Sequence, residues 1–103
     1  MEPSPQERLW QALSCIPEGQ VIAYGSLAVM AGLPGRARWV GRTLAALPSD
    51  TRLPWHRVIN AAGRISFAPG TEAFEHQRRR LEAEGVIVRD DGRVDKRTFM
   101  TGL

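Results

Sequence analysis

The chain has 103 residues, 43% of them hydrophobic and 24% charged, with 14 Lys and Arg against 11 Asp and Glu and a net charge of +3. These values predict one globular domain over residues 1–103 and exclude a membrane span, because no apolar run approaches the roughly 18 residues it needs. Residues 1–5 lack a basic segment followed by an apolar one, so we expect no signal peptide and a cytoplasmic protein. The single cysteine, Cys15, excludes an internal disulfide, and no spacing of Cys and His resembles a metal site.

Residues 5–15 predict the first helix. Leu9 and Leu13 have helical spacing, and Pro5 lies near the start, where a helix tolerates proline. Cys15 comes at the end of this helix in an apolar context, so we expect it to be a buried structural thiol.

The next segment predicts two short helices joined by a glycine turn. Ser26 is a candidate N-cap for a helix over residues 26–31, and Gly32 suits the left-handed position that follows a helix. Pro34, at a first-turn position, opens a third helix over about residues 35–47. Such a pair is a helix-turn-helix, a motif of moderate specificity because many small helical hairpins bind nothing.

The second half of the chain predicts shorter strands and one long helix. Residues 55–60 and 64–67 flank a turn and predict a short hairpin or wing. A helix capped by Thr71 runs through Glu84, and the Asp-Gly pair within residues 86–94 predicts a second hairpin. The expected fold class is mainly α with short β, and its natural architecture is a winged helix-turn-helix.

Arginine is concentrated in the middle of the chain, where Asp50 is the one acidic residue. The arginines between residues 35 and 64 are Arg36, Arg38, Arg42, Arg52, Arg57 and Arg64. Guanidinium groups suit phosphate contacts and stacking better than ammonium groups do, so this run favours a polyanionic partner. A solvated basic surface without a partner is the alternative.

Motifs along residues 9–85 resemble the C-terminal domain of the O6-alkylguanine-DNA alkyltransferases. The motifs recur in order, at residues 16–21, 24–25, 27–28, 31–32, 37–38, 40–41 and 54–59. In those enzymes the last motif contains Pro-Cys-His-Arg-Val, and here Trp55 replaces the reactive cysteine. This replacement, with segments 53–61, 63–66 and 81–86, resembles the alkyltransferase-like proteins, the non-enzymatic branch of the family.

The resemblance implies a function without catalysis. Members of this branch bind double-stranded DNA that contains O6-alkylguanine, flip the damaged nucleotide into a pocket, and leave the alkyl group in place. They are thought to flag the lesion for nucleotide excision repair, through proteins of the UvrA type. The resemblance also implies a monomer with no cofactor and no membrane partner.

The chemistry of Trp55 agrees with that implication. Alkyl transfer from a guanine oxygen needs a soft, activated nucleophile, in practice a thiolate. The indole nitrogen only donates hydrogen bonds, so Trp55 cannot accept an alkyl group at a useful rate. It can supply a flat apolar wall for a base or an alkyl substituent. A purely structural role in the core is the alternative.

Five further residues match positions that handle DNA in the family. Arg38 matches the residue that fills the gap left by the flipped base, and Tyr24 matches the tyrosine that crowds the target phosphate. Val58 would contribute backbone atoms to the base pocket. Two of these residues have two possible roles each. Gly41 either allows close approach to the DNA backbone or packs within the protein, and Ser66 either caps its loop or touches the lesion.

Three residues match the network beneath the reactive cysteine. His56 and Glu84 correspond to the residues that help activate the thiol, and without a thiol we expect them to persist as a polar network under the pocket. For Arg57 we favour a structural hydrogen-bonding role over DNA contact.

The chain also departs from the family. Ala68 and Pro69 stand where the enzymes have a Tyr-Ser pair that contacts the guanine oxygen, which implies a roomier pocket. Leu47 replaces an asparagine that buttresses the turn, and Trp39 follows the finger position where a small residue is usual. Trp39 either packs inward or bears on DNA.

The last predicted helix carries His76 followed by three arginines at residues 78–80. We expect a solvated face here, with a secondary phosphate or partner contact as the alternative.

The residues alone leave two other functions open. An enzyme would use Cys15 or another group for alkyl transfer and would remove the methyl group stoichiometrically. A winged-helix regulator would prefer an undamaged sequence and gain little from alkylation.

Overall fold

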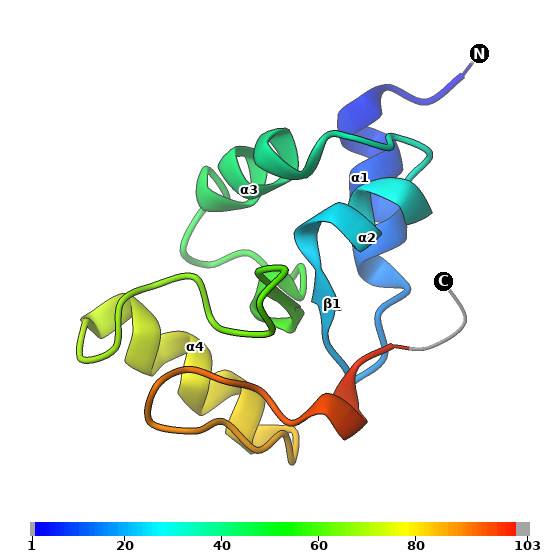
Figure 1. Ribbon diagram of the computed structural model, residues 1–103. Helices are drawn as coiled ribbons and strands as arrows, with labels where there is room; N and C mark the ends of the chain where they lie inside the picture. Colours follow the sequence, from blue (N-terminus) through cyan, green and yellow to red (C-terminus); the bar gives the residue numbers. More distant parts are fainter. Residues whose placement is uncertain (1, 101–103) are drawn as a thin grey trace.

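The computed structural model describes residues 2–100 (Figure 1). Its elements are, in chain order, α1 (Pro5–Ser14), β1 (Ile22–Ala23), α2 (Tyr24–Met30), α3 (Ala37–Ala45), the 3₁₀ helix η1 (Trp55–Arg57), β2 (Val58–Ile59), α4 (Glu72–Ala83) and the 3₁₀ helix η2 (Lys96–Thr98). Helices dominate, and the sheet found in this part of the chain has two short strands, which confirms the expected class of mainly α with short β. No helix within residues 2–100 has the length and apolar character that a bilayer crossing requires.

The start of α1 is set by local interactions. Ser4 is the N-cap: its Oγ accepts from the Glu7 N–H at 3.1 Å, and the Glu7 carboxylate accepts from the Ser4 N–H at 3.4 Å. The buried face of the helix carries Leu9 and Leu13. The expectation of a buried thiol is wrong, because Cys15 is the C-cap and lies outside this stripe, exposed to solvent.

Both helices of the helix-turn-helix differ in their bounds from the prediction. α2 begins at Tyr24, two residues early and with no side-chain cap, so Ser26 is not its N-cap. α3 is shorter than predicted at both ends and begins at Ala37. Gly35 cannot belong to it, because its φ of +80° is left-handed. Gly32, with a φ of +76°, confirms the expected left-handed turn after α2.

The sheet pairs segments that are far apart in the chain. β1 and β2 run parallel, with Ile22 opposite Val58. A tight turn follows β2, where the Asn60 N–H donates to the Arg64 carbonyl at 3.0 Å. The arms of this turn do not form a ladder with each other, because β2 pairs with β1 and Arg64 forms an antiparallel bridge with Arg93. The predicted turn is therefore present, but the predicted strand pairing is wrong.

The C-terminal elements follow their local signals. The Thr71 Oγ1 caps α4 by accepting from the Phe74 N–H at 3.2 Å, and Glu84 is the C-cap, so the predicted helix is confirmed. Val88 and Val94 form an antiparallel bridge around the Asp-Gly turn, which confirms the second hairpin.

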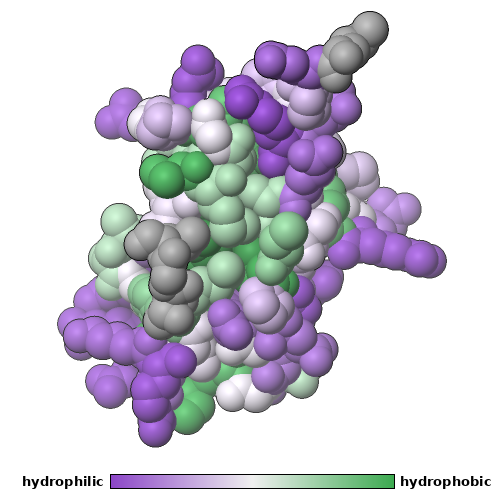
Figure 2. Space-filling view, turned by 90° about the vertical axis from the view of Figure 1, so that its right-hand side faces the viewer, coloured by the Kyte–Doolittle hydropathy of each residue, from purple (hydrophilic) through white to green (hydrophobic). Residues whose placement is uncertain are grey.

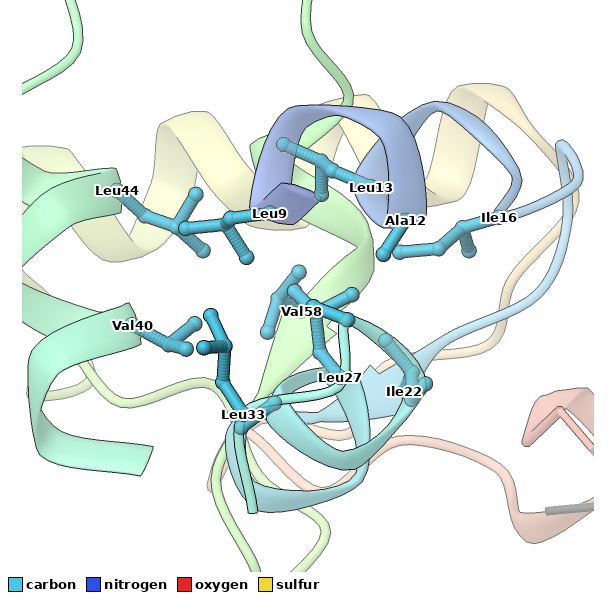
Figure 3. Close-up of a cluster of buried hydrophobic side chains, with 12 residues drawn as sticks. Leu9, Ala12, Leu13, Ile16, Ile22, Leu27, Leu33, Val40, Leu44 and Val58 are labelled. Atoms are coloured by element: carbon cyan, nitrogen blue, oxygen red, sulfur yellow. The ribbon is translucent and has the colours of Figure 1, made fainter. Parts of the chain in front are cut away.

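Two hydrophobic clusters meet at β2. One joins α1, α2, α3 and β2, and Figure 3 shows its side chains converging from these elements. The other contains Phe74 and Leu81 of α4 and the valines of the C-terminal hairpin. Val58 belongs to the first cluster and Ile59 to the second, because successive residues of a strand point to opposite faces. This short strand therefore holds α3 and α4 on two different cores.

The side of the molecule that faces right in Figure 1 is shown as a surface in Figure 2. Hydrophobic residues occupy the middle of this face and hydrophilic residues its margins. α1 and α2 lie on this side, whereas α3 and α4 extend to the other side (Figure 1). The apolar middle of this face therefore lies on the side of α1 and α2.

Candidate nucleic-acid interface

A groove of about 1180 Å³ lies between α3 and α4, with η1 between the two helices (Figure 1). Its lining residues are Tyr24, Gly25, Ala37, Arg38, Gly41, Leu44, Ala45, Leu47, Pro48, Ser49, Trp55, Asn60, Ala61, Ser66, Phe67, Glu72, Ala73, His76, Gln77 and Arg79. The lining is mainly apolar with a few polar groups, and the volume exceeds the roughly 300–1,000 Å³ of most small-molecule sites. The groove can therefore receive a group as large as a nucleotide.

Trp55 forms part of the groove wall and contacts three side chains. The His76 ring stacks on the indole with 5.6 Å between ring centroids and 7° between planes. The His56 ring meets it edge-on, at 6.1 Å and 86°, and the Arg80 guanidinium carbon lies 5.5 Å from its centroid. His76 and Arg80 are one turn apart on α4, so this helix positions both against Trp55. The indole is thus held in a defined orientation while it stays half-buried at the groove.

Beneath Trp55, three side chains form a hydrogen-bonded network. The His56 Nε2 lies 2.8 Å from the Glu84 Oε2. Arg57 donates from Nη2 to the same oxygen at 2.7 Å and from Nη1 to the Ile16 carbonyl at 2.8 Å. The Gly19 N–H also donates to Glu84, at 3.2 Å. The guanidinium of Arg57 is therefore engaged within the protein, as expected for a structural role.

The network sets the protonation states of His56 and Glu84. Burial raises the pKa of Glu84, but the hydrogen bonds from Arg57, His56 and Gly19 outweigh it and lower the pKa from 4.5 to about 2. Burial lowers the pKa of His56 below 6.5, and the bond to Glu84 offsets only part of that effect. At neutral pH the imidazole is therefore neutral and donates from Nε2 to a carboxylate. The buried Nδ1 is then an acceptor with no hydrogen-bond partner among the described residues.

Gln77 connects α4 to the backbone of η1 and β2. Its buried side chain donates from Nε2 to the carbonyls of His56 at 3.0 Å and Val58 at 3.1 Å. These bonds attach α4 to the segment that carries Trp55.

The opposite part of the groove brings together residues of α2, α3 and the loop after β2. The Ser66 Oγ donates to the Tyr24 Oη at 3.2 Å. Gly41 of α3 faces the Tyr24 ring, and a Cβ added there would lie 4.0 Å from two ring carbons, an ordinary contact. The protein's own packing therefore does not require glycine at this position.

The six central arginines do not form one surface. Arg38 lines the groove, and Arg79 of α4 joins it from the other side. Arg42 lines a second hollow of about 460 Å³, together with Trp39 and Gln6. Trp39 also packs against the α1–α3 core, so its side chain is directed toward α1 and away from the main groove.

The structure collects most of the predicted site residues. Those that line the groove are Tyr24, Arg38, Gly41, Trp55 and Ser66. Those in the network beneath it are His56, Arg57 and Glu84. Val58 is fully buried behind the groove, with its carbonyl occupied by Gln77. Ala68 and Pro69 are exposed and are not part of the lining.

Two aromatic side chains of the groove were not among the predicted site residues. His76 is exposed, as predicted, but also stacks on Trp55, and Phe67, 42% exposed, supplies the loop's apolar contact with the groove. A signal for His76 exists in the sequence. His76, Arg80 and Glu84 recur every four residues, so a helix that directs Glu84 to the pocket directs the other two to nearby positions.

Comparison with known proteins identifies the class. Residues 4–86 match the model of the family described as 6-O-methylguanine DNA methyltransferase, DNA binding domain, and the chain belongs to this family. It is similar to the DNA base-flipping protein of Escherichia coli, with 45% identity over 98 residues that cover 95% of this chain and 74% of the relative. Alkyltransferase-like protein 1 of Schizosaccharomyces pombe is 42% identical over 81 residues, which are 79% of this chain and 75% of the relative.

A solved structure gives the same grouping. The crystal structure of Schizosaccharomyces pombe Atl1 in complex with damaged DNA containing O6-carboxymethylguanine matches with a TM-score of 0.81 and 31% identity, over 99% of this chain and 100% of that chain. These similarities group the chain with the alkyltransferase-like proteins, which confirms the resemblance predicted from the sequence motifs.

Proposed function

We propose that this protein binds duplex DNA containing O6-alkylguanine, receives the flipped guanine in the groove against Trp55, and leaves the alkyl group in place. The observation that carries the proposal is the position of Trp55. It lies in the groove wall, in edge-on contact with His56 and above the bond from His56 to Glu84. In the family's enzymes this motif position holds the reactive thiol, and an indole has no comparable nucleophile.

The distribution of other nucleophiles supports binding without transfer. The one cysteine, Cys15, caps α1 and is not among the groove-lining residues. The Glu84–His56 pair could activate a neighbouring thiol, but the ring next to it is the Trp55 indole. The buried Nδ1 of His56 has no hydrogen-bond partner among residues 2–100.

The remaining groove residues support base flipping. Extruding a base costs a few kcal/mol of stacking, and a guanidinium that stacks in the vacated space offsets part of that cost. Arg38 is exposed at the groove on α3 and is the residue we assign to this role. Tyr24, bonded to Ser66 across the groove from Trp55, is the residue we assign to the target phosphate.

The descriptions of two relatives are consistent with this proposal. One is described as a DNA base-flipping protein, and the solved structure of Atl1 contains damaged DNA with O6-carboxymethylguanine. Because an intact alkyl group still has to be removed, we extend the proposal to hand-over of the lesion to nucleotide excision repair through a UvrA-type protein. We further propose that the protein acts as a cytoplasmic monomer.

A paired titration tests the proposal. Two duplexes of one sequence, with guanine or O6-methylguanine at one position, are titrated at one stated salt concentration, because phosphate contacts make affinity salt-dependent. We expect tighter binding of the alkylated duplex and an unchanged DNA mass after incubation. Equal affinity would favour the sequence-reading regulator, and stoichiometric loss of the methyl group would favour the enzyme. Trp55→Ala should reduce the preference and should not introduce transfer.

A further inference from the structure

The stack between Trp55 and His76 is offset. Parallel rings in contact lie about 3.5–4 Å apart, yet the two centroids are 5.6 Å apart with only 7° between the planes. The rings are therefore displaced sideways, as in most aromatic pairs in proteins. The smaller imidazole therefore covers only one part of the indole face, and the Arg80 guanidinium carbon lies 5.5 Å from the indole centroid.

His76 is also exposed and lines the same groove as Trp55. It sits on the rigid middle of α4, whose neighbouring Gln77 is bonded to the carbonyls of His56 and Val58. The position of the imidazole relative to the indole is thus set by the backbone, while its side chain remains free to rotate toward solvent.

We propose that His76 determines the size of alkyl group that the groove accepts, an inference that rests on the proposed function. A substituent on the guanine oxygen that packs on Trp55 shares the indole face with the imidazole. A methyl group needs only a small part of that face and leaves the imidazole in place. A planar substituent such as benzyl needs the area that His76 occupies, so the histidine must leave its stack before such a group can bind.

The size of the effect follows from the strength of an aromatic pair. Displacing His76 from Trp55 weakens binding of a large substituent by between about twofold and tenfold relative to methyl. Removing the ring at position 76 should recover that factor for the large substituent alone.

The experiment uses the full chain and three duplexes of one sequence, which carry guanine, O6-methylguanine or O6-benzylguanine. The dissociation constants are measured for the parent, His76→Gln and His76→Phe at one salt concentration. His76→Gln removes the ring, and we expect the benzyl-to-methyl affinity ratio to rise by about twofold to tenfold. His76→Phe keeps a flat ring, and we expect its ratio to stay near that of the parent.

A matched control and the contrary outcomes complete the design. Glu75→Gln, on the same helix but outside the groove lining, should leave the ratio unchanged. An unchanged ratio in His76→Gln, or an equal rise in His76→Phe, overturns the role of His76. An equal affinity change for all three duplexes in His76→Gln also overturns it, because that is the behaviour of a phosphate contact. If the parent binds the three duplexes alike, the proposed function falls as well.

Discussion

Trp55 has surroundings that suit recognition of an aromatic ligand. Its ring is stacked by His76, approached edge-on by His56 and covered in part by the Arg80 guanidinium. Aromatic and cation–π contacts of this kind orient an indole without giving it nucleophilic character. At the scale of single residues, the groove therefore offers a flat aromatic surface in a defined orientation.

Arg38→Ala tests the assignment of the residue that fills the space of the flipped base. The side chain is exposed on α3, so we expect an intact fold and at least a tenfold loss of affinity for the O6-methylguanine duplex. Arg36→Ala is the control, because Arg36 is also exposed but does not line the groove. The affinities are measured by titration. Equal losses of affinity in the two variants would show that Arg38 acts only as a phosphate contact.

Gly41→Ala separates the packing role of this glycine from a DNA-binding role. A Cβ here meets the Tyr24 ring at an ordinary 4.0 Å, and alanine favours a helix by up to about 1 kcal/mol. We expect an equal or higher melting temperature together with weaker DNA binding, because the methyl group would stand between α3 and the DNA backbone. A lowered melting temperature with unchanged affinity would assign Gly41 to packing.

At the scale of elements, Glu84 joins three parts of the chain. It is the C-cap of α4 and accepts hydrogen bonds from His56 and Arg57 of η1 and from the Gly19 backbone. Arg57 extends the connection to the C-terminal end of the α1 segment through the Ile16 carbonyl. This network thus connects the groove wall to α1 and α4.

This network predicts that acid destabilises the fold. The pKa of Glu84 is about 2 in the folded state, so its stabilisation is present above about pH 4.5 and is lost as pH falls through 2. The lowered pKa of His56 acts in the same direction, because the unfolded chain takes up a proton first as pH drops below 6.5. We expect the unfolding free energy, from denaturant titrations, to decrease steadily from pH 7 to pH 2.

Glu84→Gln isolates the carboxylate. The variant should be less stable than the parent at pH 7, because Arg57 loses its charged partner, and the difference should shrink as the pH approaches 2. A difference that stays constant over this range would show that the ionised carboxylate is not the source of the stability.

At the scale of the whole molecule, the groove results from two cores that share one strand. α3 packs on the first cluster and α4 on the second, and β2 contributes Val58 to one and Ile59 to the other. The helices are thereby held apart with Trp55 between them. The modest net charge of +3 attracts any duplex, whereas the groove is what can distinguish an alkylated one.

This division predicts different salt dependences for affinity and for selectivity. Between about 50 and about 200 mM salt, we expect the affinity for undamaged duplex to fall roughly tenfold to hundredfold, because phosphate contacts release counterions. The ratio of lesion to undamaged affinity should change little, since the contacts in the groove are largely uncharged. A ratio that falls as steeply as the affinity would mean that selectivity also rests on phosphate contacts.

Local sequence determined many of the helix ends and turns of this protein. The capped starts of α1 and α4, the left-handed Gly32 and the Asp-Gly hairpin follow from residues within a few positions of one another. The motif at residues 54–59 identified the family and placed Trp55 in its pocket. Such signals are readable because capping, helical spacing and turn geometry act between near neighbours in the chain.

Other features were decided only by the tertiary structure. β2 pairs with β1 instead of the segment after its own turn, and His76, although exposed, stacks on Trp55. Cys15 is exposed although Leu13 and Ile16 near it are buried. In each case the outcome depends on which distant segment packs nearby, and local spacing alone does not identify that segment. The sequence thus placed Trp55 within the family motif, while the packing of α4 decided what lies against it.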